Sequence, residues 1–238
     1  MNEMLVLFDI DGTLLRSRGV GLRAMEEALF ELHGVPVDGS TIKSGGRLDH
    51  HIFLEMSEMH DLPVHEDALK AFQEAYVARM AHAFDMESWS YSLPGAHELT
   101  KAVHEHSEMT SAIMTGNIEP TSWMKIQDAG FSKEWFEFGV FGDEAATRRE
   151  LTPIARARHE DRRGRAIAPS QVVVIGDTEH DIDCARHSGC RSIAVASGMT
   201  SLETLEAHEP DLLLPSLDDT TTILHWLENQ MQQAGTLH

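Results

Sequence analysis

A short aliphatic run that ends in two aspartates and a glycine constrains this chain more than any other feature. The run Met4–Leu7 leads directly into Phe8-Asp9-Ile10-Asp11-Gly12-Thr13-Leu14. A short apolar run that stops at a turn predicts a buried strand. Residues two apart on a strand point to the same side, so we expect Asp9 and Asp11 to project together. Two neighbouring carboxylates repel each other unless a proton or a metal lies between them, so the pair indicates a functional site rather than a capped loop.

A second acidic cluster follows another apolar run. Val172–Ile175 is also typical of a buried strand, and it ends in Gly176-Asp177-Thr178-Glu179-His180-Asp181. In an open parallel sheet the carboxyl ends of the strands lie along one edge, where ligands bind. We therefore expect Asp177 to come near Asp9 and Asp11. Convergent carboxylate oxygens of this kind suit Mg²⁺, which also takes phosphate oxygens of a substrate.

Asp181 has two interpretations that are compatible with each other. Thr178-Glu179-His180-Asp181 matches a capping box, so Asp181 caps the helix that it opens. In the other interpretation it belongs to the metal site. The predicted metal set is therefore Asp9, Asp11, Asp177 and Asp181.

Apolar strands alternate with helical patterns along most of the chain. The exception is the stretch 16–90, where helical periodicity over 20–34, 49–59 and 69–84 stands without a strand signal. Alternating strands and helices imply a parallel sheet with right-handed crossovers. We predict an α/β fold: a three-layer, Rossmann-like core of residues 1–15 and 91–238, with an α-helical cap domain of residues 16–90 inserted. The tail after Gln230 is predicted to be loose.

Composition narrows the class of protein and its partners. A net charge of −20 over 238 residues excludes nucleic acid as a partner, because too few cations are present to neutralise a run of phosphates. No apolar stretch reaches the length of a membrane span, and the first one is too short for a signal peptide. Cys184 and Cys190 are too few for a disulfide framework. We expect a cytoplasmic monomer or homodimer that acts on a small molecule and has no membrane partner.

Three motifs carry a resemblance to a known family. Asp9–Leu14 resembles the first motif of the haloacid-dehalogenase superfamily, and Gly176–Asp181 resembles its fourth. Ser111-Ala112-Ile113-Met114-Thr115-Gly116-Asn117 is similar to the second motif, a strand that ends in a hydroxyl. The resemblance covers residues 5 to 217.

The third motif of that family is a basic residue, usually lysine, further along the chain. Lys125 and Lys133 stand too close to Thr115 to fit this spacing. Arg148 and Arg149 stand at the expected place. We assign the motif to Arg148, with Arg149 as the alternative; an arginine keeps the charge but makes a forked contact instead of a point contact.

The resemblance implies a role for each motif residue. Asp9 is the nucleophile that forms an aspartyl-phosphate, and Asp11 is the general acid and base. Mg²⁺ is held by the Asp9 side chain, the Asp11 backbone carbonyl and Asp177. The phosphoryl oxygens are bound by Thr115, Gly116, Asn117 and Arg148.

The second aspartate selects among the activities of the superfamily. Its dehalogenases have no acid at the position of Asp11, because a halide leaves without a proton. Asp11 therefore favours a Mg²⁺-dependent phosphatase that hydrolyses a small phosphorylated metabolite. Gly45-Gly46-Arg47-Leu48-Asp49 resembles the cap loop of phosphoglycolate-phosphatase-like relatives, so Arg47 either meets an anionic group of the substrate or faces solvent.

Three alternatives stay open at this point. A phosphonatase needs a cap lysine, for which Lys43 and Lys70 are the candidates. A sugar phosphomutase shares the fold but needs a specialised cap. A catalytically degenerate protein that binds Mg²⁺ and phosphate for regulation is the alternative from another class, since the usual lysine is missing.

Overall fold

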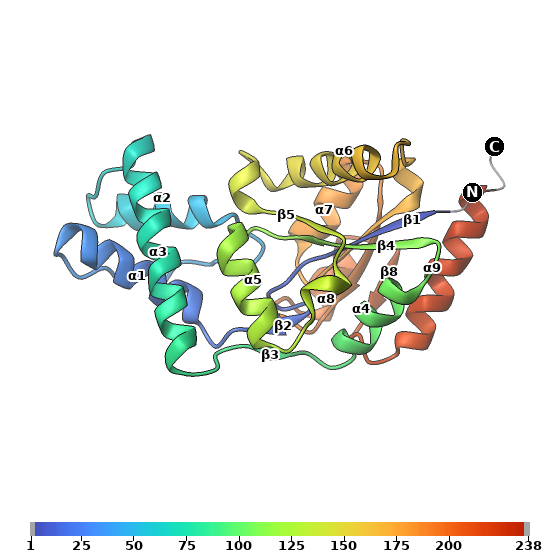
Figure 1. Cartoon of the computed structure of the whole chain (residues 1–238), viewed down its shortest axis with the longest axis horizontal. Helices are drawn as coiled ribbons and strands as arrows, with labels where there is room; N and C mark the ends of the chain where they lie inside the picture. The colour runs from blue at the N-terminus through green and yellow to red at the C-terminus, as the bar shows by residue number, and fades with distance from the viewer. Residues whose placement is uncertain (1–2, 236–238) are drawn as a thin grey trace.

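A computed structural model describes residues 3–235, and its centre is a parallel sheet of six strands (Figure 1). The strand order is β5-β4-β1-β6-β7-β8, and every pair of neighbours is parallel. The strands are β1 (Met4–Phe8), β4 (Met109–Met114), β5 (Phe138–Val140), β6 (Val172–Gly176), β7 (Arg191–Val195) and β8 (Leu212–Leu214). The first strand of the chain therefore lies in the middle of the sheet, between β4 and β6.

Helices cover both faces of the sheet, which makes three layers. They are α4 (Ala96–Glu105), α5 (Glu119–Asp128), α6 (Leu151–Arg163), α7 (Glu179–His187), α8 (Leu202–Ala207) and α9 (Thr220–Gly235). Met4 and Phe8 of β1 pack with α4, α5 and α9, whereas Leu5 and Leu7 pack with α6 and α7. Successive side chains alternate across the sheet, and both faces are buried, so the strand is apolar throughout. The predicted three-layer α/β fold is confirmed.

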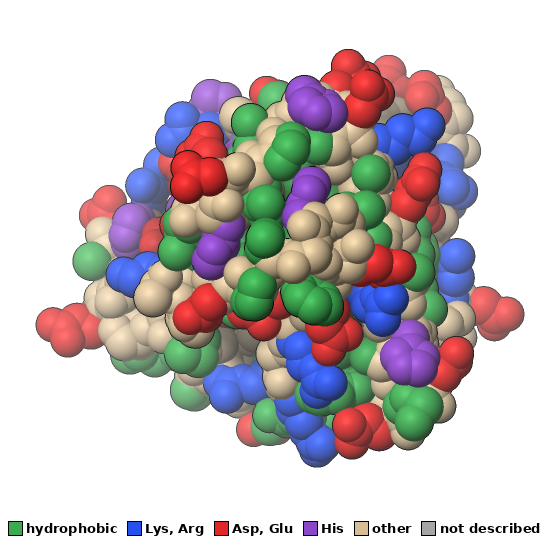
Figure 2. Space-filling model, turned by 90° about the vertical axis from the view of Figure 1, so that its left-hand side faces the viewer, with side chains coloured by type: hydrophobic (Ala, Val, Ile, Leu, Met, Phe, Trp, Pro, Cys, Tyr) green, Lys and Arg blue, Asp and Glu red, His purple; other side chains and the backbone are tan. Residues whose placement is uncertain are grey.

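Three further helices pack together beside the sheet: α1 (Val20–His33), α2 (Asp49–Met59) and α3 (Glu66–Met86). The aromatic and methionine stripe of α3 forms their common core, where Phe72 stacks on Phe53 at 4.5 Å and on Tyr76 at 5.6 Å between ring centroids. Ile118, at the start of α5, packs into the same cluster. Seen from the side of α1–α3, acidic, basic and histidine side chains are interspersed on the outer surface (Figure 2).

A small antiparallel ribbon lies where the chain passes between these two parts. It pairs β2 (Leu15–Arg16) with β3 (Tyr91–Ser92), and no pattern in the sequence predicts it. Two residues per strand leave no periodicity to detect. The boundaries predicted for the inserted helices, at residues 16 and 90, fall at this ribbon.

Other element boundaries differ from the sequence analysis in small ways. Short 3₁₀ turns at Lys133–Trp135, Gly142–Glu144, Arg148–Glu150 and Pro169–Gln171 complete the described elements. The tail predicted to be loose after Gln230 is helical as far as Gly235, because Met231 still packs on the core. Within residues 3–235, no helix combines the length and apolarity that crossing a membrane requires.

Candidate active site

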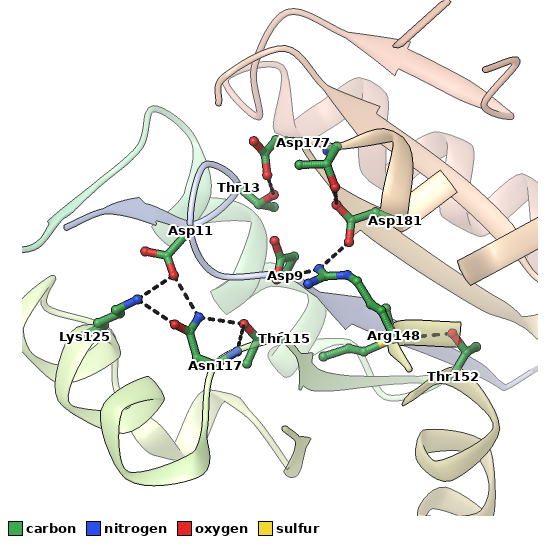
Figure 3. A network of polar contacts seen from close by, with 12 residues as sticks. Asp9, Asp11, Thr13, Thr115, Asn117, Lys125, Arg148, Thr152, Asp177 and Asp181 are labelled. Atoms are coloured by element: carbon green, nitrogen blue, oxygen red, sulfur yellow. Dashed lines mark hydrogen bonds and ion pairs between the residues drawn. The ribbon is translucent and has the colours of Figure 1, made fainter. Parts of the chain in front are cut away.

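The carboxyl ends of three neighbouring strands bring the motif residues to one edge of the sheet (Figure 3). Asp9 follows β1, Thr115 follows β4, and Asp177 follows β6. The register explains their proximity, since Phe8 is the partner of both Ile113 and Ile175 in the adjacent strands. Residues distant in the sequence therefore meet at this edge, where open α/β sheets bind ligands.

Three buried aspartates form an acidic cluster at this edge. One oxygen each from Asp9, Asp177 and Asp181 lies within 4.8 Å of the others. Burial raises the pKa of Asp9 to about 7 even though Arg148 opposes the shift. Burial, together with the charges of Asp9 and Asp181, also raises the pKa of Asp177 well above its usual range. Buried carboxylates that repel one another and present only oxygen ligands fit a divalent cation such as Mg²⁺.

The loop after β1 needs a glycine to let Asp177 approach. Gly12 has a φ of +85°, and a Cβ at this position would lie 2.3 Å from Oδ2 of Asp177. Glycine adopts this conformation without strain and leaves the space free. The hydroxyl of Thr13 donates to Oδ1 of Asp177 at 3.3 Å. The glycine of the first motif, Gly12, therefore leaves room for the carboxylate of the fourth motif, Asp177.

Asp181 caps α7, as one interpretation of the sequence expected, and it also lies in the acidic cluster. Its Oδ2 accepts hydrogen bonds from the backbone N–H and the hydroxyl of Thr178, at 3.1 and 2.7 Å. This contact completes the predicted capping box at the start of α7. Its Oδ1 accepts from Arg148 at 2.6 Å, inside the acidic cluster.

Of the two candidate arginines, Arg148 is the one that lies in the site. Its Nη2 is 3.0 Å from Oδ1 of Asp9, and the guanidinium is buried. Burial alone would lower the pKa of Arg148, but Asp181 and Asp9 raise it well above its usual range. Arg149 instead pairs with Asp183 at the surface, at 2.6 Å.

The carboxylate of Asp11 belongs to a second network, apart from the acidic cluster. It accepts from Ser17 at 2.9 Å, from the amide of Asn117 at 2.8 Å and from Lys125 at 2.7 Å. Asp9 and Asp11 both line the same cavity, but their carboxylates contact different partners, because β1 ends at Phe8 and strand alternation does not extend to Asp11. Burial acts to raise the pKa of Asp11, yet Lys125 and the hydrogen bonds lower it overall.

Lys125 is a site residue that the motif spacing did not predict, because it stands too close to Thr115 in the sequence. It comes from α5, and its Nζ donates to Asp11 and to Oδ1 of Asn117, both at 2.7 Å. The available signal was the buried face of this helix, which carries Thr121, Ser122 and Lys125. A lysine on a buried face needs a charged partner, and the helix begins directly after the second motif.

The second motif also receives the loop that precedes α2. The hydroxyl of Thr115 accepts from the Asn117 side chain at 2.8 Å. The carbonyl of Gly116 accepts from the backbone N–H of Asp49 at 2.9 Å, and a Cβ on Gly116 would lie 2.0 Å from the Arg47 carbonyl oxygen. Only glycine permits this close approach of two backbones.

Asp49 joins the two parts of the chain. Its Oδ2 accepts from the N–H of Ile118, at the start of α5, at 3.0 Å. Burial raises the pKa of Asp49 to about 7, while Lys125 acts to lower it.

Arg47 lines the cavity near the strand ends, and its guanidinium also has partners within the helical part. Its guanidinium forms an ion pair with Glu55 and donates to the carbonyls of Lys43 and His51, each at 3.3 Å. Its charge is therefore already compensated within the helical part.

A cavity of about 230 Å³ lies between the sheet edge and the helices α1–α3. Asp9, Asp11, Thr115, Arg148 and Lys125 line it from the sheet side. The helical part and the loop before α2 contribute a second set of lining residues, among them Gly21, Arg47, Asp49 and Tyr76. A ligand bound at the strand ends would be enclosed by both parts.

Comparisons with known proteins agree with this architecture. A family model described as HAD-hydrolase-like matches residues 147–220, the stretch that contains Arg148, Asp177 and Asp181. The phosphoglycolate phosphatase of Vibrio vulnificus (strain YJ016) is 26% identical over 231 residues, which cover 90% of this chain and 92% of that protein. A hydrolase from Pseudomonas syringae has a TM-score of 0.68 at 19% identity, covering 94% of this chain and 98% of that one. CbbY from Rhodobacter sphaeroides, solved in complex with phosphate, has a TM-score of 0.65 at 22% identity, covering 91% and 96%.

Proposed function

Because this chain is a phosphoglycolate-phosphatase-like member of the haloacid-dehalogenase superfamily, we propose that it is a Mg²⁺-dependent phosphatase for a small phosphorylated metabolite. The observation that carries the proposal is the position of Asp9. This carboxylate is buried at the end of the central strand, 3.0 Å from Arg148 and beside two further aspartates, facing a cavity. A nucleophile placed next to a cation at a ligand cavity suits attack on a phosphate monoester.

In the proposed reaction a carboxylate oxygen of Asp9 attacks phosphorus, and the bond from phosphorus to the leaving oxygen breaks. Asp11 gives a proton to the leaving oxygen and then takes one from the water that hydrolyses the aspartyl-phosphate. The lowered pKa of Asp11 favours the ionised form, which the second step needs. A dianionic phosphate bound beside Asp11 opposes that shift and favours the protonated form for the first step.

The remaining residues of the site hold charge and position. Arg148 and the hydroxyl of Thr115, with the amides of Gly116 and Asn117, are proposed to bind the phosphoryl oxygens. Asp9, the backbone carbonyl of Asp11, and Asp177 are proposed to hold Mg²⁺, with Asp181 next to them. The metal supplies positive charge that offsets repulsion between the carboxylates and the phosphate.

The three helices α1–α3 are proposed to be a cap, residues 16–90, on a core of residues 1–15 and 91–238. Their own apolar cluster and the ribbon at the crossing support this division. The cap would close the cavity over the substrate and determine which leaving groups fit. We propose that the protein acts in the cytoplasm, which the unpaired cysteines Cys184 and Cys190 support.

Hydrolysis of p-nitrophenyl phosphate with Mg²⁺ and with EDTA tests the proposal. We expect turnover that needs Mg²⁺, and a phosphorylated protein detectable by mass spectrometry after rapid acid quenching. Turnover that survives EDTA would contradict the metal assignment. Binding of Mg²⁺ and phosphate without any turnover would favour the regulatory alternative.

A further inference from the structure

The hydroxyl of Tyr76 is a buried polar group without a partner at hydrogen-bond distance, and the residue that carries it lines the cavity. The residue is 1% exposed, its ring packs in the core of α1–α3, and its oxygen reaches no hydrogen-bond partner among the described residues. The Thr121 hydroxyl lies near it and has lone pairs for the phenol proton, but its own proton is donated to the carbonyl of Ile118 at 3.1 Å, so it gives the phenol oxygen no donor. A buried hydroxyl left unpaired costs free energy, so this one calls for a partner that enters the cavity.

An ammonium group lies on the other side of the same small space. Lys125 has three N–H donors, and Asp11 and Asn117 accept two of them, which leaves one for a ligand. A Cβ built on Gly21 would lie 3.4 Å from the Tyr76 hydroxyl and 3.8 Å from Nζ of Lys125. The two polar groups therefore flank one point of the cavity, in front of helix α1.

The glycine at position 21 supports a ligand at this point. Gly21 is the second residue of α1 and does not have the left-handed conformation that favours glycine, so alanine would be the better helix former. A methyl group there would make only ordinary contacts, so the protein itself does not require the space. A ligand that fills this space would explain the glycine, because a methyl group at position 21 would then collide with the ligand.

The charges around this space decide which chemistry it accepts. Asp11 and Asp49 both line the cavity on this side, and Lys125 is already paired with Asp11. Arg47 forms an ion pair with Glu55. A second anionic group on the substrate would meet two carboxyl groups here and two cations, Lys125 and Arg47, that are already in ion pairs, whereas a hydroxyl can donate to a carboxylate and accept from an ammonium or a phenol.

We propose that Tyr76, Lys125 and Gly21 form a specificity subsite for a neutral hydroxyl group on the leaving group of the substrate. This inference rests on the proposed phosphatase function and deepens it. The substrate is then a phosphate monoester of a sugar or polyol, and esters with a carboxylate or a second phosphate at this place are selected against. The phenol stays protonated in this site, because burial raises the pKa of Tyr76 well above its usual range.

Three monoesters of equal chain length test the subsite: glycerol 1-phosphate, propyl phosphate and 3-phosphoglycerate. They present a hydroxyl, a methyl group and a carboxylate, respectively, to the same region. We expect kcat/KM with Mg²⁺ to be highest for glycerol 1-phosphate. An equal or higher value for 3-phosphoglycerate or propyl phosphate would overturn the inference.

Two variants assign the preference to named residues. Tyr76→Phe should lower kcat/KM for glycerol 1-phosphate about 3- to 10-fold, the scale of one hydrogen bond, and leave propyl phosphate unchanged. Gly21→Ala should raise KM for glycerol 1-phosphate but not for acetyl phosphate, whose leaving group is short. Tyr91→Phe is the matched control, because this tyrosine is exposed and lies outside the cavity. An equal loss with all esters in Tyr76→Phe would contradict the subsite.

Binding to the Asp9→Asn protein separates this inference from the proposed function. Calorimetry with the same three esters reports the preference without turnover. If the wild-type protein hydrolyses neither these esters nor p-nitrophenyl phosphate, while glycerol 1-phosphate still binds tightest and binds more weakly in Asp9→Asn/Tyr76→Phe, the proposed function fails and the subsite stands. If hydrolysis occurs but binding shows no preference, the subsite fails and the phosphatase stands.

Discussion

The cavity has one end at Asp9, Asp177 and Asp181 and another at Tyr76 and Lys125, and the charged groups at these two ends are paired in different ways. At the strand ends, Arg148 pairs with Asp9 and Asp181 while Asp177 lies beside them, so three carboxyl groups face one cation. At the other end Asp11 is paired with Lys125, and the unsatisfied group is the neutral hydroxyl of Tyr76. On the proposals made above, cations would complete the first end, and a neutral polar group would complete the second.

The two ends also differ in how the chain builds them. The end at the sheet edge, where we propose that phosphate binds, is formed by residues directly after β1, β4 and β6. The register of the sheet holds these residues side by side. The opposite end comes from helices α1, α3 and α5, whose packing places Gly21, Tyr76 and Lys125 around one space. Substitutions should therefore abolish the chemistry at the first end and alter selection or stability at the second.

Asp9→Asn should have the largest effect. Removing the nucleophile leaves only positioning and electrostatic effects, so we expect turnover of p-nitrophenyl phosphate to fall by at least about 10³-fold. The variant should still fold, because the asparagine amide has the shape of the carboxyl group that it replaces. It also removes a buried carboxyl group whose pKa burial raises to about 7. Thermal unfolding followed by circular dichroism is the control. An active Asp9→Asn protein would contradict the covalent mechanism.

Arg148→Ala should have the next largest effect, and it tests whether one cation holds the phosphate end together. We expect a loss of about 2–4 kcal/mol in kcat/KM, the scale of one preorganised charged contact. Arg148→Lys should recover much of the loss. Arg149→Ala is the matched control, because that side chain pairs with Asp183 at the surface and should be nearly silent. If Arg149→Ala causes the larger loss, the assignment of the third motif is wrong.

The difference between the two ends also explains which parts were predictable. The strands, the three-layer fold and the meeting of Asp9 with Asp177 follow from local patterns, because parallel strands bring their carboxyl ends together. The orientation of Asp11 did not follow, since the chain leaves the strand after Phe8 and alternation no longer applies. Lys125 and Tyr76 stand on buried helix faces, where a core position and a cavity position have the same periodicity.

Asp177→Ala should weaken metal binding without removing the nucleophile. We expect the Mg²⁺ concentration for half-maximal activity to rise by at least about tenfold, as is usual when support for a metal site is lost. The Mg²⁺-dependent rise in melting temperature should shrink in parallel, which gives a readout independent of turnover. Asp128→Ala is a control for the loss of a carboxylate outside the cluster, since Asp128 binds backbone N–H groups near Trp89. Unchanged Mg²⁺ dependence in Asp177→Ala would place the metal elsewhere.

The smallest effect is expected at the other end, in how stability depends on pH. Asp49 keeps its proton in the folded protein up to about pH 7, whereas the pKa of an ordinary aspartate is 3.8. Between these values the folded state binds more protons than the unfolded state, so the stability that depends on this group falls as pH rises from about 4 to 7. Asp49→Asn cannot titrate and still accepts the N–H of Ile118. Its free energy of unfolding, relative to wild type, should therefore rise by about 1–2 kcal/mol between pH 4 and pH 7.5, below the full linkage value because water can enter beside the ionised carboxylate.

Urea unfolding of both proteins at several pH values measures this difference. The control is Asp38→Asn, at an exposed aspartate whose hydrogen bonds to Ser40 lower its pKa, and it should not show such a rise. A constant difference between Asp49→Asn and wild type would mean that Asp49 is ionised when buried, with Lys125 balancing its charge, and both ends of the cavity would then be completed by cations.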